Sequence, residues 1–291
     1  MKKKLKVGIL GTGNIGTDLL IKILRSDLLE CVAFVGRNLN SIGMRKALEL
    51  GVPISDKSIQ AFTSGFFDVD LVFDATSALC HKKHAPLLKE MGIVAIDMTP
   101  SQVGDLCVPA INLIDCVDSN NLNMITCGGQ SSIPIAYILK KSAPSVDYIE
   151  VVSAISSNSA GPGTRANLDE YIKNTEQGLK YFTGCEEVKA IINLNPAKPN
   201  IEMQTTIFAK SDRCDLDKVT IAINECVTRI QKYVPGYRLV IGPVFESGRI
   251  MVMVRVSGLG DYLPSYAGNL DIINCAAIAA AEEYAKKAVT L

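Results

Sequence analysis

The sequence predicts an α/β protein in two parts, a doubly wound parallel sheet followed by an α+β region. In the first part, short apolar runs alternate with segments of helical spacing, which is typical of strands joined by crossover helices. A glycine-rich turn at residues 11–16 joins the first apolar run to the first helical segment. Beyond residue 148 the apolar runs follow one another with few helices between them, which indicates an α+β arrangement.

The first part begins with an apolar run at residues 6–10, which leads into Gly11-Thr12-Gly13-Asn14-Ile15-Gly16 and then into a helical pattern. A strand, this glycine pattern and a helix in that order are typical of a dinucleotide-binding Rossmann domain. Gly11 permits the tight turn, Gly13 lets the backbone approach a pyrophosphate at the positive end of the helix, and Gly16 lets the helix pack on the strand. Further strands are expected at 31–35, 70–73 and 93–96, with a helix at 41–50.

Two segments bear on the cofactor. Where NAD-binding domains carry an acidic residue after the second strand, this sequence reads Gly36-Arg37-Asn38. Arg37 can meet the 2′-phosphate of NADP, or it can stack on adenine and leave the choice open; we favour NAD. Asp74-Ala75-Thr76-Ser77 follows a later strand, and it either lines the nicotinamide end of the crevice or simply caps the next helix.

Cys127 stands at a joint between an apolar run and a helix. Gly128 and Gly129 follow it, and a helix is expected from Ser132 to Ser142. A thiol at a helix N-terminus feels the positive end of the helix dipole, so its pKa is expected to fall and its thiolate to be populated. The nearby N–H groups can hold a developing oxyanion. The alternative is a buried structural cysteine; we favour a catalytic nucleophile.

The second part is predicted to contain five strands and two helices, and a last helix is expected to pack back on the first part. The loop from Asn158 to Asn167 contains Gly-Pro-Gly. Either turn chemistry alone explains this loop, or its small residues allow close approach of a flat cofactor ring. The strands are expected at 148–156, 189–194, 201–209, 237–241 and 249–257, and the helices at 166–182, 216–234 and 269–287.

The composition is that of a globular protein with a sizeable core. The chain has 291 residues, 48% of them hydrophobic, which suits one large domain or two ordinary ones. Its formal net charge is zero, so we expect no nucleic-acid partner. No apolar run approaches the ~18 residues of a membrane span, and the basic first residues lack the apolar core of a signal peptide. We therefore expect a cytoplasmic protein with no membrane partner.

Nine cysteines are scattered along the chain without a Cys-x-x-Cys pair, which favours free cytosolic thiols over disulfides or a zinc site. The two histidines, His81 and His84, stand beside Cys80, and we interpret this segment as a solvated helix start. His-x-x-His without further ligands is weak evidence for a metal, so we expect none.

A dinucleotide-binding domain followed by a nucleophilic cysteine suggests a cysteine-dependent aldehyde dehydrogenase. The thiolate adds to an aldehyde and gives a thiohemiacetal, which loses a hydride to the nicotinamide and becomes a thioester. Water, phosphate or a thiol then accepts the acyl group.

The sequence resembles the acylating acetaldehyde dehydrogenases of the meta-cleavage pathways of aromatic hydrocarbon catabolism. That family shares a fold with glyceraldehyde-3-phosphate and aspartate-semialdehyde dehydrogenases. The motifs that carry the resemblance run nearly from end to end: Gly11-Thr-Gly-Asn-Ile-Gly16, Asp74-Ala-Thr-Ser77, Ile96-Asp-Met-Thr-Pro100, Thr126-Cys-Gly-Gly-Gln130, Ser159-Ala-Gly-Pro-Gly-Thr-Arg-Ala-Asn167 and Gly268-Asn-Leu-Asp-Ile272.

The resemblance implies an NAD-dependent oxidation of acetaldehyde in which coenzyme A accepts the acetyl group from a Cys127 thioester. It implies a dinucleotide-binding domain at 1–126 and 265–291, and a catalytic and dimerisation domain at 127–264 like the C-terminal domain of glyceraldehyde-3-phosphate dehydrogenase. It also implies a 4-hydroxy-2-oxovalerate aldolase partner, bound to a homodimer within a heterotetramer. The cofactor-binding residues that it implies are Thr12, Gly13, Asn14, Ile15, Asn158, Ser159, Ala160, Gly161, Pro162, Gly163, Thr164, Arg165, Ala166 and Asn269.

The sequence departs from the related enzymes at the base. No histidine follows Cys127, which excludes the histidine base of the glyceraldehyde-3-phosphate type. An aspartate on a central strand assists the thiol in the family, and its place here falls on Thr205. The helix dipole, a water or another carboxylate such as Asp271 is then expected to activate the thiol. Two alternatives stay open: another cysteine-dependent semialdehyde dehydrogenase, which would use phosphate and NADP, and a non-catalytic NAD(H)-binding protein.

Overall fold

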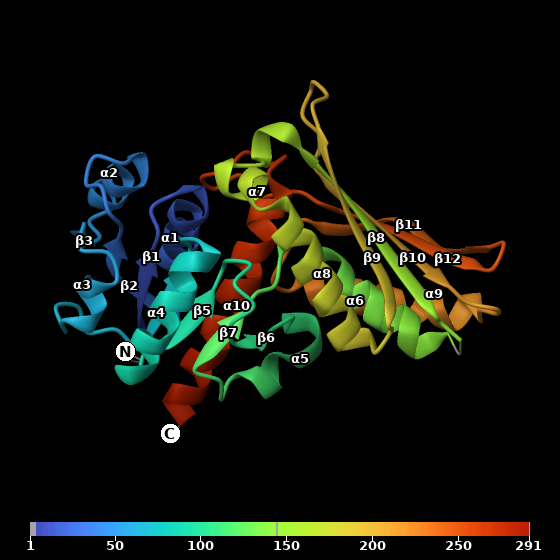
Figure 1. Cartoon of the computed structure of the whole chain (residues 1–291), viewed down its shortest axis with the longest axis horizontal. Coiled ribbons are helices and arrows are strands. Elements are labelled where there is room, and N and C mark those ends of the chain that lie inside the picture. The colour runs from blue at the N-terminus through green and yellow to red at the C-terminus, as the bar shows by residue number, and fades with distance from the viewer. Residues whose placement is uncertain (1–3, 144, 291) are drawn as a thin grey trace. The chain divides into compact units, whose positions relative to one another are not determined.

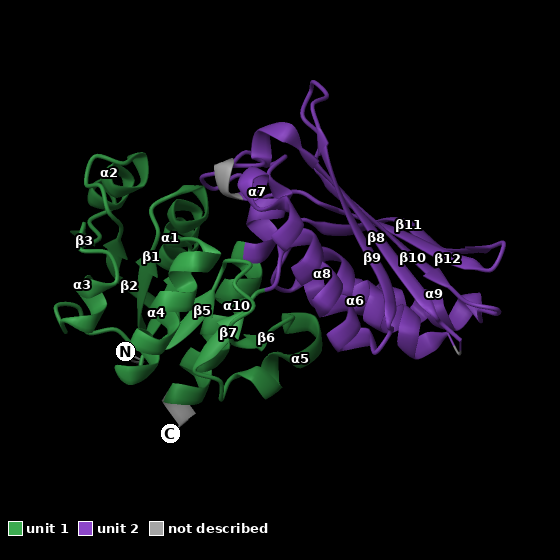
Figure 2. Ribbon diagram, in the orientation of Figure 1, with its two compact units in different colours: residues 1–124, 274–291 green, residues 125–273 purple. Residues whose placement is uncertain are grey.

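The computed structural model describes residues 4–143 and 145–290, which divide into two compact units. The first unit consists of residues 1–124 and 274–291, and the second of residues 125–273 (Figure 2). The second unit is therefore an insertion in the sequence of the first. No helix among the described residues is both long enough and apolar enough to cross a membrane.

The first unit is built on a parallel sheet, with strand order β3-β2-β1-β4-β5-β7-β6 (Figure 1). Its central strands are apolar along their length because helices lie on both faces of such a sheet. Leu10, Val35 and Val72 are fully buried, for example. The strands are β1 Leu5–Leu10, β2 Leu29–Val35, β3 Ile54–Ser55, β4 Leu71–Asp74, β5 Val94–Asp97, β6 Asp105–Leu106 and β7 Asn121–Asn123.

The helices of the first unit connect these strands, and most of the last helix of the chain also belongs to this unit. Two side chains of that helix bind earlier residues of the same unit: Asn274 Nδ2 donates to Asp18 Oδ2 at 2.8 Å, and the Tyr284 hydroxyl donates to the Cys116 carbonyl at 3.1 Å. The helices are α1 Asn14–Arg25, α2 Ile42–Glu49, α3 Gln60–Thr63, α4 Ala78–Glu90, α5 Pro109–Cys116 and α10 Gly268–Thr290.

The second unit has a mixed sheet with strand order β11-β12-β10-β8-β9, in which only the β8–β9 pair is parallel among the described residues. The side chains of β10 alternate along the strand. Thr205 and Ile207 are buried, whereas Gln204 and Phe208 are half-buried on the opposite face. The strands are β8 Tyr148–Ser156, β9 Glu187–Asn195, β10 Met203–Lys210, β11 Tyr237–Glu246 and β12 Arg249–Val256.

Three helices of the second unit pack along this sheet, with α6 between α8 and α9 (Figure 1). This arrangement of a parallel sheet and a separate α+β unit confirms the predicted fold class. The helix that was expected to start at Ser132 begins five residues earlier, at Cys127. The helical segments are α6 Cys127–Ser142, the 3-10 turn η1 Ser157–Ser159, α7 Pro162–Ala166, α8 Leu168–Thr183 and α9 Leu216–Gln231.

Candidate active site

The early start of α6 follows from a capping interaction. Thr126 is the N-cap residue, and its hydroxyl oxygen accepts a hydrogen bond from the Gly129 N–H at 2.9 Å. The same hydroxyl contacts the Thr175 hydroxyl of α8 at 2.8 Å, and Thr175 donates to the Tyr171 carbonyl at 2.8 Å. Cys127 is therefore the first residue of a helix whose N-terminus is tied to α8.

The residue before this cap has an unusual backbone conformation. Ile125 has φ +64°, a region that β-branched side chains rarely adopt, and its side chain is buried. Gly129 and Gly178 both approach it closely: a Cβ added to either would lie about 3 Å from Ile125 Cγ2. Such a conformation costs about 1–3 kcal/mol and persists only where the surroundings enforce it. This backbone conformation sets the direction in which the chain enters α6, and hence the position of Cys127.

Cys127 is half-buried, and its sulfur lies 3.6 Å from the Tyr171 hydroxyl oxygen. Burial raises the pKa of Cys127, and hydrogen bonds with Tyr171 and with the backbone N–H groups of Gly128 and Cys127 only partly oppose this rise. The prediction of a lowered pKa for Cys127 was therefore wrong. The helix start supplies the expected N–H groups, but the loss of hydration outweighs them.

Tyr171 is held against Gly128, and no side chain fits between them. A Cβ added to Gly128 would lie 2.1 Å from the Tyr171 hydroxyl oxygen and 3.2 Å from Ser153 Oγ. Tyr171 itself is buried, and burial raises its pKa well above the usual value. The phenol is therefore a neutral group at physiological pH, able to donate or to accept a hydrogen bond.

We expect the substitution Gly128→Ala to lower the free energy of unfolding by about 1–3 kcal/mol, because the new methyl group has to displace the phenol. Urea titration followed by circular dichroism measures the change. Gly242→Ala is the matched control, since the nearest atom to its added Cβ is Leu239 Cδ2 at 3.9 Å. Equal stability of the Gly128→Ala and Gly242→Ala variants would contradict the close approach.

A line of buried hydroxyl groups continues from Tyr171 to the sheet of the second unit. Ser153 on β8 contacts Thr205 on β10, with 3.2 Å between Oγ and Oγ1. Thr205 Oγ1 lies 2.9 Å from Ser131 Oγ, and Ser131 donates to the Gly128 carbonyl at 3.0 Å. Each of these three hydroxyl side chains is at most 2% exposed. Thr205, the residue at the place expected for an aspartate, is thus part of the surroundings of Cys127.

The groups that act on the pKa of Cys127, among the described residues, come from α6 and α8. Asp271, the suggested substitute base, is buried in the first turn of α10 and is not one of them. Tyr171 was not foreseen. Its spacing to Thr175, Gly178 and Leu179 marks a buried helix face, but the sequence carries no signal that pairs it with a cysteine 44 positions away.

The glycine-rich turn has the features expected for a phosphate site. Gly11 has φ +118°, and an added Cβ would lie 2.5 Å from the Ala75 carbonyl oxygen. A Cβ on Gly16 would lie 1.9 Å from the Gly11 carbonyl oxygen and 3.3 Å from Ile9 Cγ2 of β1, so the helix packs closely on the turn and on the strand. Gly13, the exposed N-cap residue of α1, has open space around its added Cβ, and no described side chain caps the helix. The first N–H groups of α1 are therefore free to bind an anion.

The residues predicted to hold the phosphates surround this helix start. Thr12 and Ile15 are half-buried, and Asn14 is exposed. Arg37, after β2, is exposed as well. Their role in binding a cofactor stays a prediction.

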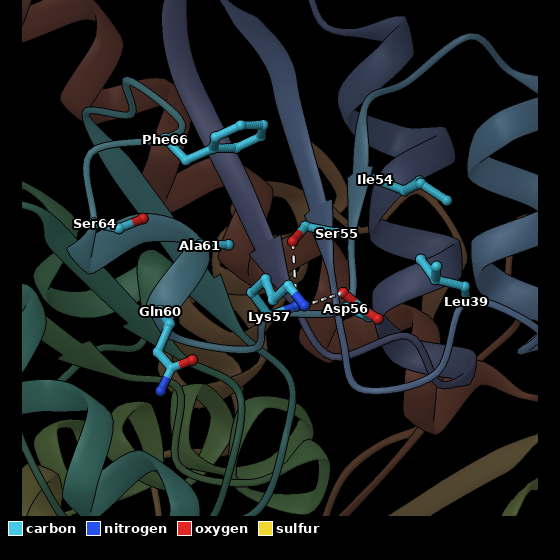
Figure 3. Close-up of a pocket in the computed structure, with 9 residues that line it drawn as sticks. All are labelled: Leu39, Ile54, Ser55, Asp56, Lys57, Gln60, Ala61, Ser64 and Phe66. Atoms are coloured by element: carbon cyan, nitrogen blue, oxygen red, sulfur yellow. Dashed lines mark hydrogen bonds and ion pairs between the residues drawn. The ribbon is translucent and has the colours of Figure 1, made fainter.

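A pocket of about 490 Å³ lies beside β3, between the loop that follows Arg37 and the start of α3 (Figure 3). Its lining is mixed: Lys57 and Asp56 form an ion pair at 3.5 Å at one end, and the exposed ring of Phe66 stands at the other. The residues that line it are Leu39, Ile54, Ser55, Asp56, Lys57, Gln60, Ala61, Ser64 and Phe66.

The segment that begins at Asp74 is fixed by a buried cluster. Asp74 Oδ1 accepts hydrogen bonds from the backbone N–H and the hydroxyl of Thr76, at 3.1 and 2.5 Å. Asp74 Oδ2 lies 2.9 Å from His81 Nδ1 and 2.8 Å from His84 Nδ1. The interpretation of the histidines as a solvated helix start was wrong: both are buried, because they satisfy a carboxylate at the end of β4. Ser77 does cap α4, accepting from the Cys80 N–H at 3.3 Å.

The charges of this cluster are coupled. Burial alone would raise the pKa of Asp74, but hydrogen bonds from His81, His84 and Thr76 bring it down to about 2. Burial would lower the pKa of His81, but its hydrogen bond to Asp74 and the charge of Asp97 raise it. Burial raises the pKa of Asp97 to about 6. The carboxylate of Asp74 thus stays ionised because two histidines face it.

The loop after β8 is held by its own polar groups. Asn158 is exposed, and its Nδ2 donates to Asn200 Oδ1 at 2.9 Å. Arg165 is also exposed; it donates to the carbonyls of Ser157 and Ala160 at 2.7 and 3.0 Å. Gly161 is the N-cap residue of α7. Ser159 and Ala160 are buried, Thr164 is half-buried and Ala166 is exposed. The exposure and side-chain contacts of Pro162 and Gly163 lie outside the described part of the structure.

Asn269 contacts this loop. Both were predicted to bind the cofactor, so they have to lie close to each other if that prediction holds. Its Nδ2 donates to the Ser159 carbonyl at 3.4 Å, and its side chain is 1% exposed. Its Oδ1 is buried and has no hydrogen-bond partner among the described residues. A buried acceptor without a donor is energetically costly, and such atoms are uncommon in folded proteins. This oxygen fits a ligand that carries an N–H donor, such as a carboxamide.

Comparison with known proteins places the chain near one group of enzymes. Residues 127–264 match the family model described as prokaryotic acetaldehyde dehydrogenase, dimerisation. An acetaldehyde dehydrogenase from Spirochaeta aurantia is 59% identical over 98% of this chain and 96% of the relative. One from Pectobacterium atrosepticum is 56% identical over 97% of this chain and 96% of the relative.

Solved structures show the same fold in more distant proteins. Aspartate semialdehyde dehydrogenase from Candida albicans, solved with NADP, aligns with a TM-score of 0.69 at 13% identity, covering 96% of this chain and 99% of that one. Aspartate semialdehyde dehydrogenase II from Vibrio cholerae aligns with a TM-score of 0.61 at 14% identity, covering 96% and 97%.

Proposed function

Since this chain belongs to the acetaldehyde dehydrogenase family, we propose that it oxidises acetaldehyde and other short-chain aldehydes to the acyl-coenzyme A with reduction of NAD. The observation that carries the proposal is the position of Cys127. Cys127 is half-buried and is the first residue of α6, where backbone N–H groups and the Tyr171 hydroxyl reach its sulfur.

The proposed reaction has two halves. The Cys127 sulfur attacks the aldehyde carbon, and the N–H groups at the start of α6 hydrogen-bond the oxygen as it becomes negative. Loss of a hydride and collapse of the C–O⁻ bond to a carbonyl give the thioester. The nicotinamide of the bound cofactor supplies the hydride acceptor. The thiolate of coenzyme A then attacks the thioester carbonyl, and the Cys127 thiolate leaves.

Two features of the chain support a nicotinamide dinucleotide as cofactor. The first turn of α1 offers uncapped N–H groups beside Gly13, which suit a pyrophosphate. The unpartnered Oδ1 of Asn269 suits the carboxamide N–H₂ of a nicotinamide. We propose NAD rather than NADP, with Arg37 stacking on adenine; its exposed guanidinium is the group that a 2′-phosphate would bind if NADP were used.

The decisive experiment follows reduced nicotinamide at 340 nm with acetaldehyde, coenzyme A and either NAD or NADP. We expect reduction that depends on coenzyme A and is faster with NAD. Longer aldehydes in the same assay define the chain-length range. Activity with phosphate in place of coenzyme A would overturn the proposal and favour a semialdehyde dehydrogenase. Tight NAD binding with no turnover and an unreactive Cys127 would favour a non-catalytic protein.

We also propose that the protein is a homodimer, and that this dimer binds a 4-hydroxy-2-oxovalerate aldolase to form a heterotetramer that acts in the catabolism of aromatic hydrocarbons. Residues 127–264 match a family model described as a dimerisation region, and one face of the sheet of the second unit has half-buried apolar side chains, including Phe208, Met251 and Met253. Sheet faces of this kind are ordinarily covered by another surface.

We expect Phe208→Glu to convert the dimer to a monomer, because a charge is introduced into the proposed apolar interface. Light scattering coupled to size-exclusion chromatography gives the mass of each species. Thr228→Glu is a suitable control, since Thr228 lies on the exposed side of α9. A wild-type protein that is already a monomer at micromolar concentration would remove the dimer proposal.

A further inference from the structure

The hydroxyl groups around Cys127 form one continuous chain of contacts. It runs from Cys127 Sγ to the Tyr171 hydroxyl at 3.6 Å, and through a hydrogen bond to Ser153. It continues from Ser153 to Thr205 at 3.2 Å and from Thr205 to Ser131 at 2.9 Å, and it ends at the Gly128 carbonyl, 3.0 Å from Ser131 Oγ. We call Tyr171, Ser153, Thr205 and Ser131 the hydroxyl relay.

The direction of the hydrogen bonds in the relay depends on the state of the sulfur. Each hydroxyl carries one hydrogen and can donate only once. When Cys127 is a thiol, its S–H donates to Tyr171, and every hydroxyl donates onward until Ser131 donates to the Gly128 carbonyl. When Cys127 is a thiolate, it can only accept, so Tyr171 has to donate to the sulfur. Every hydroxyl of the relay then turns to donate the other way.

The reversal needs no movement of heavy atoms. Ser131 turns its hydrogen from the Gly128 carbonyl to Thr205, and that carbonyl keeps a donor because the Ser132 hydroxyl also reaches it, at 2.7 Å. Thr205 then donates to Ser153, and Ser153 donates to Tyr171. All of these groups are buried, so a hydrogen bond lost at any point is not replaced by water.

We propose that Tyr171 is a catalytic residue whose hydroxyl donates a hydrogen bond to the Cys127 thiolate. Ser153, Thr205 and Ser131 are positioning residues that set the direction of this hydrogen bond. The inference rests on the proposed function of Cys127 as the nucleophile. The relay stabilises the anion and does not store the thiol proton, because it ends at a carbonyl, which is not a base; the proton leaves to water or a buffer base.

Among the described residues, Tyr171 is the side chain in position to donate a hydrogen bond to the Cys127 sulfur. From α8 the thiol meets the Tyr171 phenol, from α6 the N–H groups of Gly128 and Cys127, and behind the phenol β8 and β10 present the uncharged hydroxyls of Ser153 and Thr205. A hydrogen bond to the sulfur is strongest when the sulfur is an anion, and it weakens in the thioester. Tyr171 thus favours formation of the nucleophile and, in the second half of the reaction, its departure.

The test is the rate of Cys127 alkylation by iodoacetamide as a function of pH, which reports the thiolate directly and requires no cofactor. In Tyr171→Phe we expect the midpoint of the curve of alkylation rate against pH to move to higher pH. The alkylation rate at pH 7 is expected to fall by about tenfold, which is the effect of losing one hydrogen bond to a charged group. Tyr181→Phe, an exposed tyrosine of the same helix, is the control and leaves the profile unchanged. Mass spectrometry of the labelled peptide confirms that the signal comes from Cys127.

A second pair of variants tests the relay itself. Thr205→Val also moves the midpoint upward, because it removes the hydroxyl that orients Ser153. Its effect vanishes in the Tyr171→Phe background, since Thr205 acts through Tyr171. Ser153→Ala gives the same result if the valine variant does not fold. Additive effects of Tyr171→Phe and Thr205→Val, or an unchanged profile in Tyr171→Phe, overturn the proposal.

The outcome is separable from the proposed function. A shifted alkylation profile in a protein that lacks coenzyme A-dependent activity supports the relay and rejects the function. An unshifted profile in a protein that turns over acetaldehyde rejects the relay and keeps the function.

Discussion

Cys127→Ala removes aldehyde oxidation, with an expected loss of on the order of 10⁴-fold or more in kcat/KM. The variant has no nucleophile to form the thiohemiacetal, and neighbouring hydroxyls such as Tyr171 are neutral and buried. Formation of reduced nicotinamide at 340 nm, with coenzyme A present, measures the loss. The helix start survives the change, because its cap is the Thr126 hydroxyl and alanine is a good helix former.

The control for this variant is a cysteine elsewhere in the chain. Cys214 is half-buried, as Cys127 is, and burial raises its pKa too, but it lies outside the proposed site. Cys214→Ala is expected to retain full activity. Substantial activity in Cys127→Ala, or its loss in Cys214→Ala, would move the chemistry to another thiol.

Asp74→Asn destabilises the protein by about 3–5 kcal/mol, the usual effect of removing one partner from a buried charged cluster. The carboxylate accepts from Thr76, His81 and His84, and it is fully buried. An amide offers one acceptor oxygen and turns two donor hydrogens toward groups that themselves donate. Urea titration at pH 6 measures the change in the free energy of unfolding.

The difference between wild type and Asp74→Asn depends on pH in a defined direction. The folded pKa of Asp74, about 2, lies below its ordinary value of 3.8, so its contribution is present above 3.8 and is lost as the pH falls through 2. The pKa of His81 is raised above 6.5, so its contribution is full below 6.5 and is lost as the pH rises through the folded value. The difference in the free energy of unfolding between wild type and Asp74→Asn is therefore largest between pH 3.8 and pH 6.5, the ordinary pKa values of the two groups.

Asp68→Asn serves as the control for this measurement. Asp68 forms an ion pair with Lys6 at 2.6 Å, but its side chain is 85% exposed, and exposed pairs contribute little. A difference that stays constant from pH 3 to pH 9 would show that the Asp74 cluster does not titrate as described.

The sequence was sufficient for features that depend on local patterns. The glycine turn, the longer strands and the position of Cys127 near the start of a helix follow from residue types at short spacing, and the two-part fold follows from their order. The short strands β3, β6 and β7 were not predicted. The predicted start of α6 at Ser132 is too late, because the Thr126 hydroxyl caps a helix that already includes Gly128 and Gly129.

Features that depend on long-range packing could not be predicted. The pKa of Cys127 was predicted from its helix alone, but burial by the rest of the unit decides the direction. His81 and His84 sit in a polar stretch of sequence, yet they are buried because Asp74, at the end of a strand, requires donors. The strained φ of Ile125 leaves no mark in the sequence, since β-branched residues are rare in that conformation.

The insertion of the second unit within the first has a consequence for biosynthesis. The first unit contains the N-terminus, but Asp18 and Cys116 receive hydrogen bonds from Asn274 and Tyr284 of α10. On the ribosome, the strands of the seven-stranded sheet therefore emerge before α10, and the second unit is made between them as one continuous segment. Completion of the first unit is thereby delayed until α10 has been made.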